Sequence, residues 1–85
     1  MPIISQFLGV VITMYWDDHN PGHFHARYGE YEAVVDIKSG AASGKLPARV
    51  LGLVQEWRIL NEQALMEDWE LCRKQELPKQ IKPLE

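Results

Sequence analysis

Every histidine of this chain lies in one short segment. His19, His23 and His25 fall within seven residues, and Asp17 and Asp18 come directly before the first of them. Imidazole and carboxylate groups bind divalent metals and transfer protons near neutral pH, so their clustering marks a candidate site. We therefore expect any chemistry of this protein to lie at Asp17–His25.

A metal site is the first interpretation of this segment. The spacing His-x-x-x-His-x-His places His23 and His25 on one side of a strand, because alternate side chains of a strand share a face. His19, Asp17 and Asp18 would reach in from the preceding loop, and three imidazoles with a carboxylate suit zinc, manganese or iron. The alternative is that the histidines only stabilise a tight loop through hydrogen bonds to the backbone.

The second interpretation needs no metal and depends on a predicted hairpin. Segments 23–28 and 31–37 are separated by Gly29-Glu30, and glycine in the first position is typical of a type II′ turn. This turn fixes the register, so that His23 faces Asp36 and Arg27 faces Glu32. One face then carries His23, His25, Arg27, Glu32, Val34 and Asp36, and the other carries Phe24, Ala26, Tyr28, Tyr31, Ala33 and Val35.

The polar face of this hairpin holds the groups that RNA cleavage requires. His23, oriented by Asp36, could act as a general acid or base, and Glu32 could take the complementary role. Arg27 or His25 could bind the phosphate while a 2′-hydroxyl attacks it. The alternative is a solvated sheet face on which Arg27–Glu32 and His23–Asp36 are ordinary cross-strand pairs.

These residues are expected in the β-rich half of a single α+β domain that spans residues 1–85. The β-rich part covers 1–38 and should form an antiparallel meander of three to four strands, which packs against two C-terminal helices. Alternating apolar residues predict strands at Ile3–Leu8 and Val10–Trp16, with a turn at Leu8-Gly9. Ser39–Lys45 is rich in glycine, alanine and serine, and is expected to be a flexible link.

The helical part covers 47–74 and is followed by an extended tail at 76–85. Two apolar stripes at helical spacing differ in direction by roughly 80°, so one straight helix would not keep both on the core. We therefore expect helices at 47–60 and 62–74, with a bend near Asn61. The stripes are Val50, Leu53, Val54, Trp57 and Leu60, then Ala64, Leu65, Trp69 and Cys72. Trp16 is also expected in the core, whereas Glu67, Asp68 and Glu70 are expected on a solvated face.

Composition narrows the environment and the partners. The single cysteine, Cys72, argues against a disulfide framework and favours a reducing cytoplasm. The formal net charge is −3, and residues 1–40 carry two basic against five acidic side chains, so a tight nucleic-acid binder is not expected. No apolar run is long enough to span a membrane. A chain this short has a thin stability margin, and an exposed edge at Ile3–Leu8 or Tyr31–Ile37 could pair with a partner or a second copy.

Several strings resemble the bacterial family called domain of unknown function 4160. They are Met14-Tyr15, Asp18-His19-Asn20-Pro21-Gly22-His23-Phe24-His25, Tyr28-Gly29-Glu30-Tyr31-Glu32-Ala33, Gly44-Lys45-Leu46-Pro47, Glu56-Trp57, Trp69-Glu70 and Ile81-Lys82-Pro83-Leu84. The resemblance covers essentially the whole chain. It implies a short prokaryotic protein from a two-gene module similar to toxin–antitoxin pairs, whose neighbour is often a small protein of domain of unknown function 2442.

The sequence thus leaves three functions open. The favoured one is a toxin–antitoxin-type component that binds a small partner protein and has ribonuclease-like activity on the face of His23 and His25. The second is a non-catalytic interaction or regulatory module. The third is a metal-dependent hydrolase that uses His19, His23 and His25. No catalytic residue follows from the family resemblance, so the site assignments depend on the predicted register alone.

Overall fold

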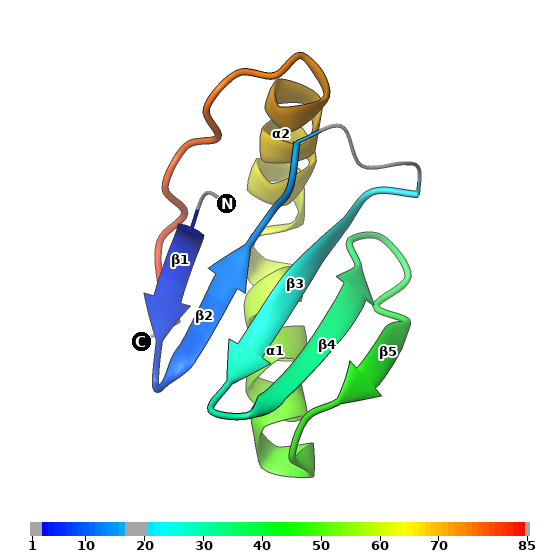
Figure 1. Ribbon diagram of the computed structural model, residues 1–85, viewed down its shortest axis with the longest axis vertical. Coiled ribbons are helices and arrows are strands. Elements are labelled where there is room, and N and C mark those ends of the chain that lie inside the picture. The colour runs from blue at the N-terminus through cyan, green and yellow to red at the C-terminus, as the bar shows by residue number, and fades with distance from the viewer. Residues whose placement is uncertain (1–2, 17–20, 85) are drawn as a thin grey trace.

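The computed structural model describes residues 3–16 and 21–84. It contains an antiparallel sheet that is followed in the chain by two helices (Figure 1). The strands follow each other across the sheet in chain order, as in a meander, and the helices come after the last strand. The α+β prediction is therefore confirmed. The elements are β1 (Ile3–Phe7), β2 (Val10–Thr13), β3 (His23–Tyr28), β4 (Tyr31–Asp36), β5 (Ala42–Lys45), α1 (Ala48–Leu60) and α2 (Glu62–Arg73).

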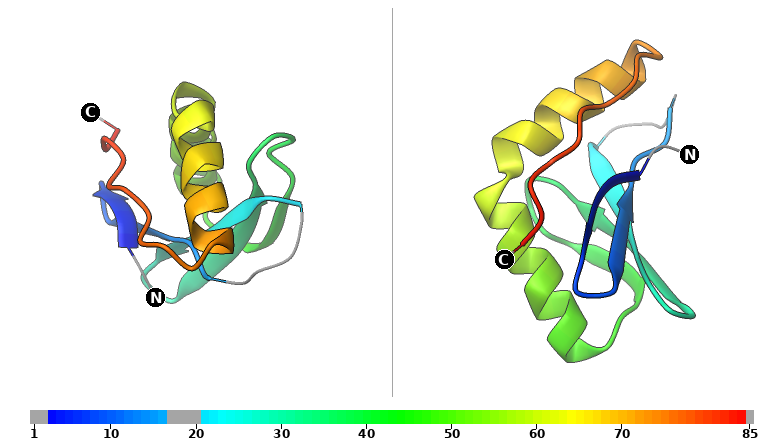
Figure 2. Two further views of the ribbon diagram at one scale, coloured as in Figure 1. Left: turned by 90° about the horizontal axis from the view of Figure 1, so that it is seen from above. Right: turned by 90° about the vertical axis from the view of Figure 1, so that its left-hand side faces the viewer.

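Both helices lie on one face of the sheet and leave the other face open (Figure 2). Trp57 of α1 packs on two phenylalanines of the sheet, with ring centroids 5.4 Å from Phe7 and 5.6 Å from Phe24. Burying aromatic and aliphatic side chains between these layers supplies the main folding energy of the domain. The core cluster includes Ile4, Val10, Ile12, Met14, Phe24, Ala26, Val35, Ile37, Val50, Val54, Trp57, Leu65, Trp69 and Cys72.

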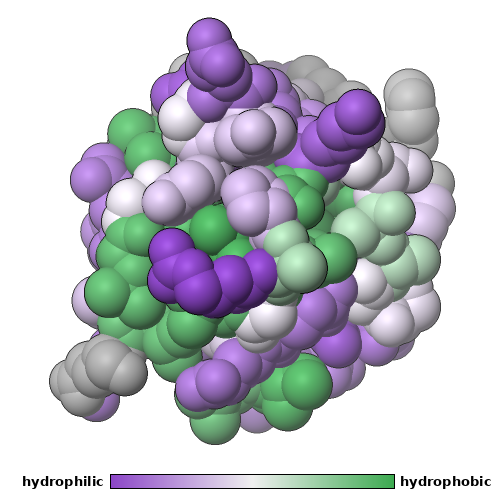
Figure 3. All heavy atoms as spheres, turned by 90° about the horizontal axis from the view of Figure 1, so that it is seen from below, coloured by the Kyte–Doolittle hydropathy of each residue, from purple (hydrophilic) through white to green (hydrophobic). Residues whose placement is uncertain are grey.

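Tight turns join β1 to β2 and β3 to β4, as expected. Leu8 and Gly9 have φ angles of 49° and 85°, and Gly29 has a φ of 58°, as the two-residue turns of hairpins require. The predicted register of β3 and β4 is confirmed, from His23 opposite Asp36 to Tyr28 opposite Tyr31. Both turns lie at the same end of the molecule, where apolar surface gathers (Figure 3). Leu8, 62% exposed, belongs to this end.

The expected flexible link Ser39–Lys45 contains a fifth strand, so the prediction of three to four strands was too low. β5 pairs with β4, with Gly44 opposite Ala33. Gly44 has a φ of 111°, and a Cβ atom there would lie 2.5 Å from the carbonyl oxygen of Glu32. All four β5 residues are exposed, so the strand has no apolar alternation to reveal it. Tyr31–Ile37 is consequently an interior strand and not an edge.

The predicted bend separates the two helices at Asn61. This residue has φ −125° and ψ 23°, outside the helical region, and its side chain Nδ2 donates to the Trp57 carbonyl at 2.9 Å. The bend turns the end of α1 away from the sheet, and Leu60 is 69% exposed. The prediction that Leu60 belongs to the core was therefore wrong, because the first stripe ends one turn earlier, at Trp57.

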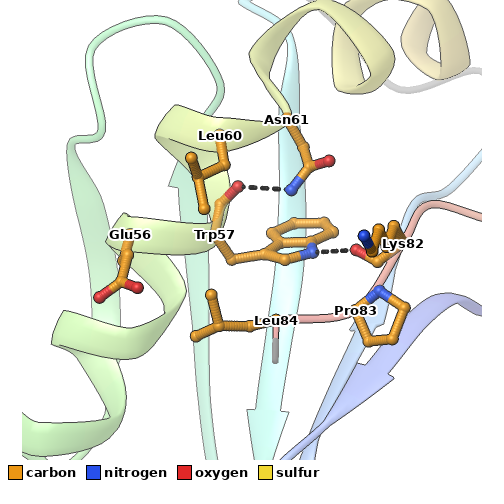
Figure 4. Close-up of a pocket in the computed structure, with 7 residues that line it drawn as sticks. All are labelled: Glu56, Trp57, Leu60, Asn61, Lys82, Pro83 and Leu84. Carbon is orange, nitrogen blue, oxygen red and sulfur yellow. Dashed lines mark hydrogen bonds between the residues drawn. The ribbon is translucent and has the colours of Figure 1, made fainter.

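The C-terminal tail runs back beside β1 and covers part of its outer edge (Figures 1 and 2). The Ile81 amide donates to the Ile4 carbonyl at 2.8 Å, and the Gln80 side chain donates to the Ile3 carbonyl at 2.6 Å. The indole Nε1 of Trp57 donates to the Lys82 carbonyl at 2.9 Å (Figure 4). A cavity of about 350 Å³ lies between α1 and the tail at this point. The tail is thus bound to both layers.

A buried carboxylate attaches the tail to α2. Asp68 is 1% exposed, and its Oδ1 accepts a hydrogen bond from the Lys79 amide at 2.8 Å. The expectation that Asp68 lies on a solvated face was wrong, because it lies between Leu65 and Cys72 on the buried side of α2. Burial raises the pKa of Asp68, and the nearby charge of Glu67 adds to this effect. No helix of the described ranges is long and apolar enough to cross a membrane.

Replacing Gly44 with alanine should destabilise the protein by about 2 kcal/mol, because the new methyl group would meet the Glu32 carbonyl and the positive φ would be strained. Gly52→Ala is the matched control. Gly52 lies in α1, and a Cβ atom added there would have no neighbour within 4 Å, so alanine should stabilise by roughly 0.5–1 kcal/mol. Urea unfolding measures both changes. Equal effects of the two substitutions would contradict the close approach of β5.

The Asp68→Asn substitution should change how stability depends on pH. The raised pKa means that the folded state binds the proton more tightly than the unfolded state, whose carboxyl titrates near 3.8. The stability associated with this group is therefore present at low pH and lost as pH rises through the folded pKa. Urea unfolding at pH 3.5 to 7 should show this loss in the wild type but not in Asp68→Asn. The exposed control Glu70→Gln should behave as the wild type does.

Candidate functional site

The open face of the β3–β4 hairpin carries the candidate site. The rings of His23 and His25 lie side by side with centroids 5.6 Å apart, on the strand that pairs with both β2 and β4. Phe24, between them in sequence, is fully buried on the opposite face. The alternation predicted from the sequence is therefore confirmed at the residues where it matters most.

His25 is the centre of this face. Its side chain is 15% exposed, and its Nδ1 lies 3.4 Å from Oε2 of Glu32, whose side chain is 50% exposed. The Tyr15 ring packs on the imidazole in a T-shaped arrangement, with centroids 4.1 Å apart. Glu32 thus reaches diagonally across the strands to His25, although its backbone partner is Arg27. A protonated His25 and an ionised Glu32 form an ion pair in this arrangement.

His23 is held from two sides. Its Nδ1 lies 2.9 Å from the Pro21 carbonyl oxygen, and because a carbonyl can only accept, Nδ1 carries the proton of this hydrogen bond. The ring also packs on Trp69 of α2, with centroids 5.1 Å apart. A Cβ atom on Gly22 would lie 3.3 Å from both Trp69 and Ile37, so glycine permits the close contact that holds His23 in place. This hydrogen bond fixes the proton on Nδ1 and the orientation of the ring.

Asp36 lies opposite His23 in the backbone register, but its carboxylate is engaged elsewhere. Oδ1 accepts hydrogen bonds from the Lys38 and Ser39 amides, each at 2.9 Å. The bond from the Ser39 amide is the main reason why the pKa of Asp36 is lowered, and the positive charge of His23 contributes least. The carboxylate therefore stabilises the turn between β4 and β5, which is a structural role that the sequence interpretation missed.

A buried arginine of α1 fixes the same turn. Arg58 is 9% exposed, and its Nη1 donates to the Ile37 carbonyl at 2.9 Å. Its Nε donates to the Gln55 side chain at 2.8 Å, and Gln55 in turn donates to the Gly40 carbonyl at 2.7 Å. The sequence did not predict that Arg58 is buried, because a charged residue beside an apolar stripe normally points to solvent.

The predicted metal ligands divide between described and undescribed residues. Asp17, Asp18 and His19 lie outside the described residues. Residues 3–16 and 21–84 contain no group of three or more histidine, cysteine, aspartate or glutamate side chains arranged to hold a metal ion. Of the proposed ligands, only His23 and His25 are therefore seen to come together, and the metal site stays a prediction.

The described part of the face instead resembles a proton-transfer site. It brings together a histidine–glutamate pair, a second histidine with a defined tautomer, and Arg27, which is exposed on the same strand. Tyr15, two residues after β2 ends, completes one wall through its ring contact with His25. Groups of this kind can remove a proton from a hydroxyl and deliver one to a leaving oxygen.

A family model described as Domain of unknown function (DUF4160) matches residues 9–70, well over half of the chain. The matched region includes β2 to β5, α1 and most of α2, and therefore the whole described site. No curated protein and no solved structure matches the chain.

The turn role of Asp36 predicts an acid-dependent loss of stability. Because its folded pKa lies below the unfolded value near 3.8, the carboxylate stabilises the fold above that pH, and the contribution is lost as pH falls through the folded pKa. Asp36→Ala should cost about 1 kcal/mol at pH 7, as the loss of a side-chain cap usually does. The difference between wild type and variant in urea unfolding should shrink below pH 4, and a difference independent of pH would contradict this role.

Proposed function

Since this chain belongs to the domain of unknown function 4160 family, whose description names no activity, we propose its function from the site: it is a ribonuclease-like component of a toxin–antitoxin-type pair. The observation that carries this proposal is the contact between Nδ1 of the largely buried His25 and Oε2 of the half-exposed Glu32 at 3.4 Å, beside His23. A half-exposed carboxylate that is held by a mostly buried imidazole is suited to general base catalysis.

The reaction that fits these groups is transesterification at an RNA phosphodiester. Glu32 takes the proton of the 2′-hydroxyl, and the 2′-oxygen forms a bond to phosphorus. The bond from phosphorus to the 5′-oxygen breaks, and protonated His23 gives its Nε2 proton to this leaving oxygen. The products are a 2′,3′-cyclic phosphate and a 5′-hydroxyl. His25 positions Glu32, and Arg27 is the cation nearest in sequence that could neutralise the phosphate oxygens.

The held geometry of His23 supports its role as the acid. The Pro21 carbonyl accepts a hydrogen bond from Nδ1 at 2.9 Å, and in the proposed reaction this bond is kept while Nε2 gives up its proton. His25 links the two proton-transfer groups of this proposal, because its ring centroid lies 5.6 Å from that of His23 and its Nδ1 lies 3.4 Å from Oε2 of Glu32. This mechanism needs no metal ion, and the proposal therefore does not depend on Asp17, Asp18 or His19.

A free sheet edge supports the second part of the proposal, that the protein binds a small partner. The tail covers β1 at Ile3 and Ile4, whereas Ala42–Lys45 of β5 is exposed along its whole length. An exposed edge accepts a strand from another chain through backbone hydrogen bonds. This edge also favours the alternative function, a non-catalytic interaction module, and it could equally join two copies of the chain.

An RNA cleavage assay on the purified protein tests the enzymatic part. Glu32→Gln and His23→Gln should each lower the cleavage rate at least about 100-fold, the usual contribution of a general acid or base. Glu30→Gln is the matched control, because Glu30 lies in the exposed β3–β4 turn. Cleavage should continue in EDTA, and a 2′-deoxy substitution at the cleaved position should abolish it.

Each contrary result selects another function. Cleavage that is lost on chelation would favour the metal-dependent hydrolase that uses His19, His23 and His25. Cleavage that is unaffected by both substitutions would place the active site elsewhere. Absence of cleavage, together with stable binding of the protein encoded by the neighbouring gene, would leave the interaction module as the function.

A further inference from the structure

Trp16 differs from the other two tryptophans of the chain. It is 47% exposed, whereas Trp57 is fully buried and Trp69 is 1% exposed. The sequence predicted all three in the core, and the prediction was wrong for Trp16 because β2 ends at Thr13, three residues before it, so no strand pairing holds Trp16 against the core. A large apolar ring is thus left in solvent directly after the residue that touches the central histidine.

A run of rings connects this position with the site. The Tyr15 ring packs on His25 at 4.1 Å, His25 lies 5.6 Å from His23, and His23 lies 5.1 Å from Trp69. Trp16 follows Tyr15 directly in the chain, so an exposed ring lies one residue beyond the Tyr15 end of this run. Exposed aromatic rings beside a phosphate-processing site are the groups on which proteins stack unpaired bases.

The charge of the face indicates how a polyanion would be held. The first forty residues carry more acidic than basic side chains, and the outer face offers Arg27 as its exposed cation on β3. Counterion release therefore contributes little to the affinity for RNA, and short-range contacts must supply most of the binding free energy. Stacking is the short-range contact that requires an unpaired base, because in a duplex the faces of each base are already covered by its neighbours.

We propose that Trp16 is the stacking platform for an unpaired base of RNA, so that single-stranded RNA is the substrate class of this site. This inference builds on the proposed ribonuclease-like function. The base adjacent to the scissile phosphate stacks on the Trp16 indole, and the phosphate then lies over His25, Glu32 and His23. Trp16 is a binding residue in this arrangement and takes no part in proton transfer.

Tryptophan fluorescence tests the contact directly. Acrylamide should quench the emission of Trp16 selectively, because Trp57 and Trp69 are buried. The probe is a short 2′-O-methyl oligoadenylate, which cannot be cleaved because its 2′-oxygens are blocked. Adding it should quench the acrylamide-accessible emission and protect it from acrylamide, in the wild type and in Glu32→Gln alike. The same oligonucleotide in a duplex with 2′-O-methyl oligouridylate should leave the emission unchanged.

Substitutions supply the second arm, with binding measured by the anisotropy of a labelled oligoadenylate. Trp16→Ala should weaken binding roughly tenfold, within the range for loss of one stacked base, while Trp16→Phe should retain most of it. Tyr31→Ala is the matched control, because Tyr31 is 46% exposed but starts β4 at the opposite end of the hairpin from His23. Melting temperatures verify that the variants are folded.

The outcomes separate this inference from the proposed function. Unchanged binding in Trp16→Ala, or emission that responds to a partner protein but not to the oligonucleotide, overturns the stacking role even where RNA is cleaved. Oligonucleotide binding that depends on Trp16, without any cleavage of ordinary RNA, supports the stacking role and removes the ribonuclease-like activity.

Discussion

The arrangement of this domain depends on packing two tryptophans of one helical segment against the same sheet. Trp57 and Trp69 are twelve residues apart, and on a straight helix twelve residues would turn the second side chain about 120° away from the first. The break at Asn61 removes this conflict by starting a new helix in a new direction. Both indoles are then buried, and Leu60 of the first apolar stripe, just before the bend, is left exposed.

The two tryptophans have different effects on the open face of the sheet. Trp57 packs on Phe7 and Phe24 and fixes the centre of the sheet from the helical side. Trp69 reaches the beginning of β3, where it packs on His23 and leaves little space beside Gly22, whose added Cβ atom would lie 3.3 Å from the indole. Arg58, one residue after Trp57, holds the turn that follows β4. One histidine of the candidate site, His23, is therefore held in part by a helix, whereas His25 is contacted by Tyr15 and Glu32.

The parts of the fold that follow from periodicity and turn chemistry could be predicted, and the parts that depend on long-range contacts could not. Glycine at the first turn position fixed the β3–β4 register, and two apolar stripes revealed the bend. β5 has no apolar alternation, and it exists because Gly44 lets it approach the Glu32 carbonyl. Asp68 was expected on a solvated face because it is charged, although its spacing from Leu65 and Cys72 places it on the buried side of α2. The diagonal contact from Glu32 to His25 required side-chain geometry that register alone does not supply.

Two aspartates that accept backbone amides show how one residue type serves opposite purposes. Asp36 accepts two amides at an exposed turn, and hydrogen bonding lowers its pKa. Asp68 accepts one amide inside the protein, and desolvation raises its pKa in spite of that bond. The difference lies in the number of donors and the access of water, since both carboxylates face backbone N–H groups. The first charge stabilises the turn beside the site, whereas the second makes attachment of the tail sensitive to protonation.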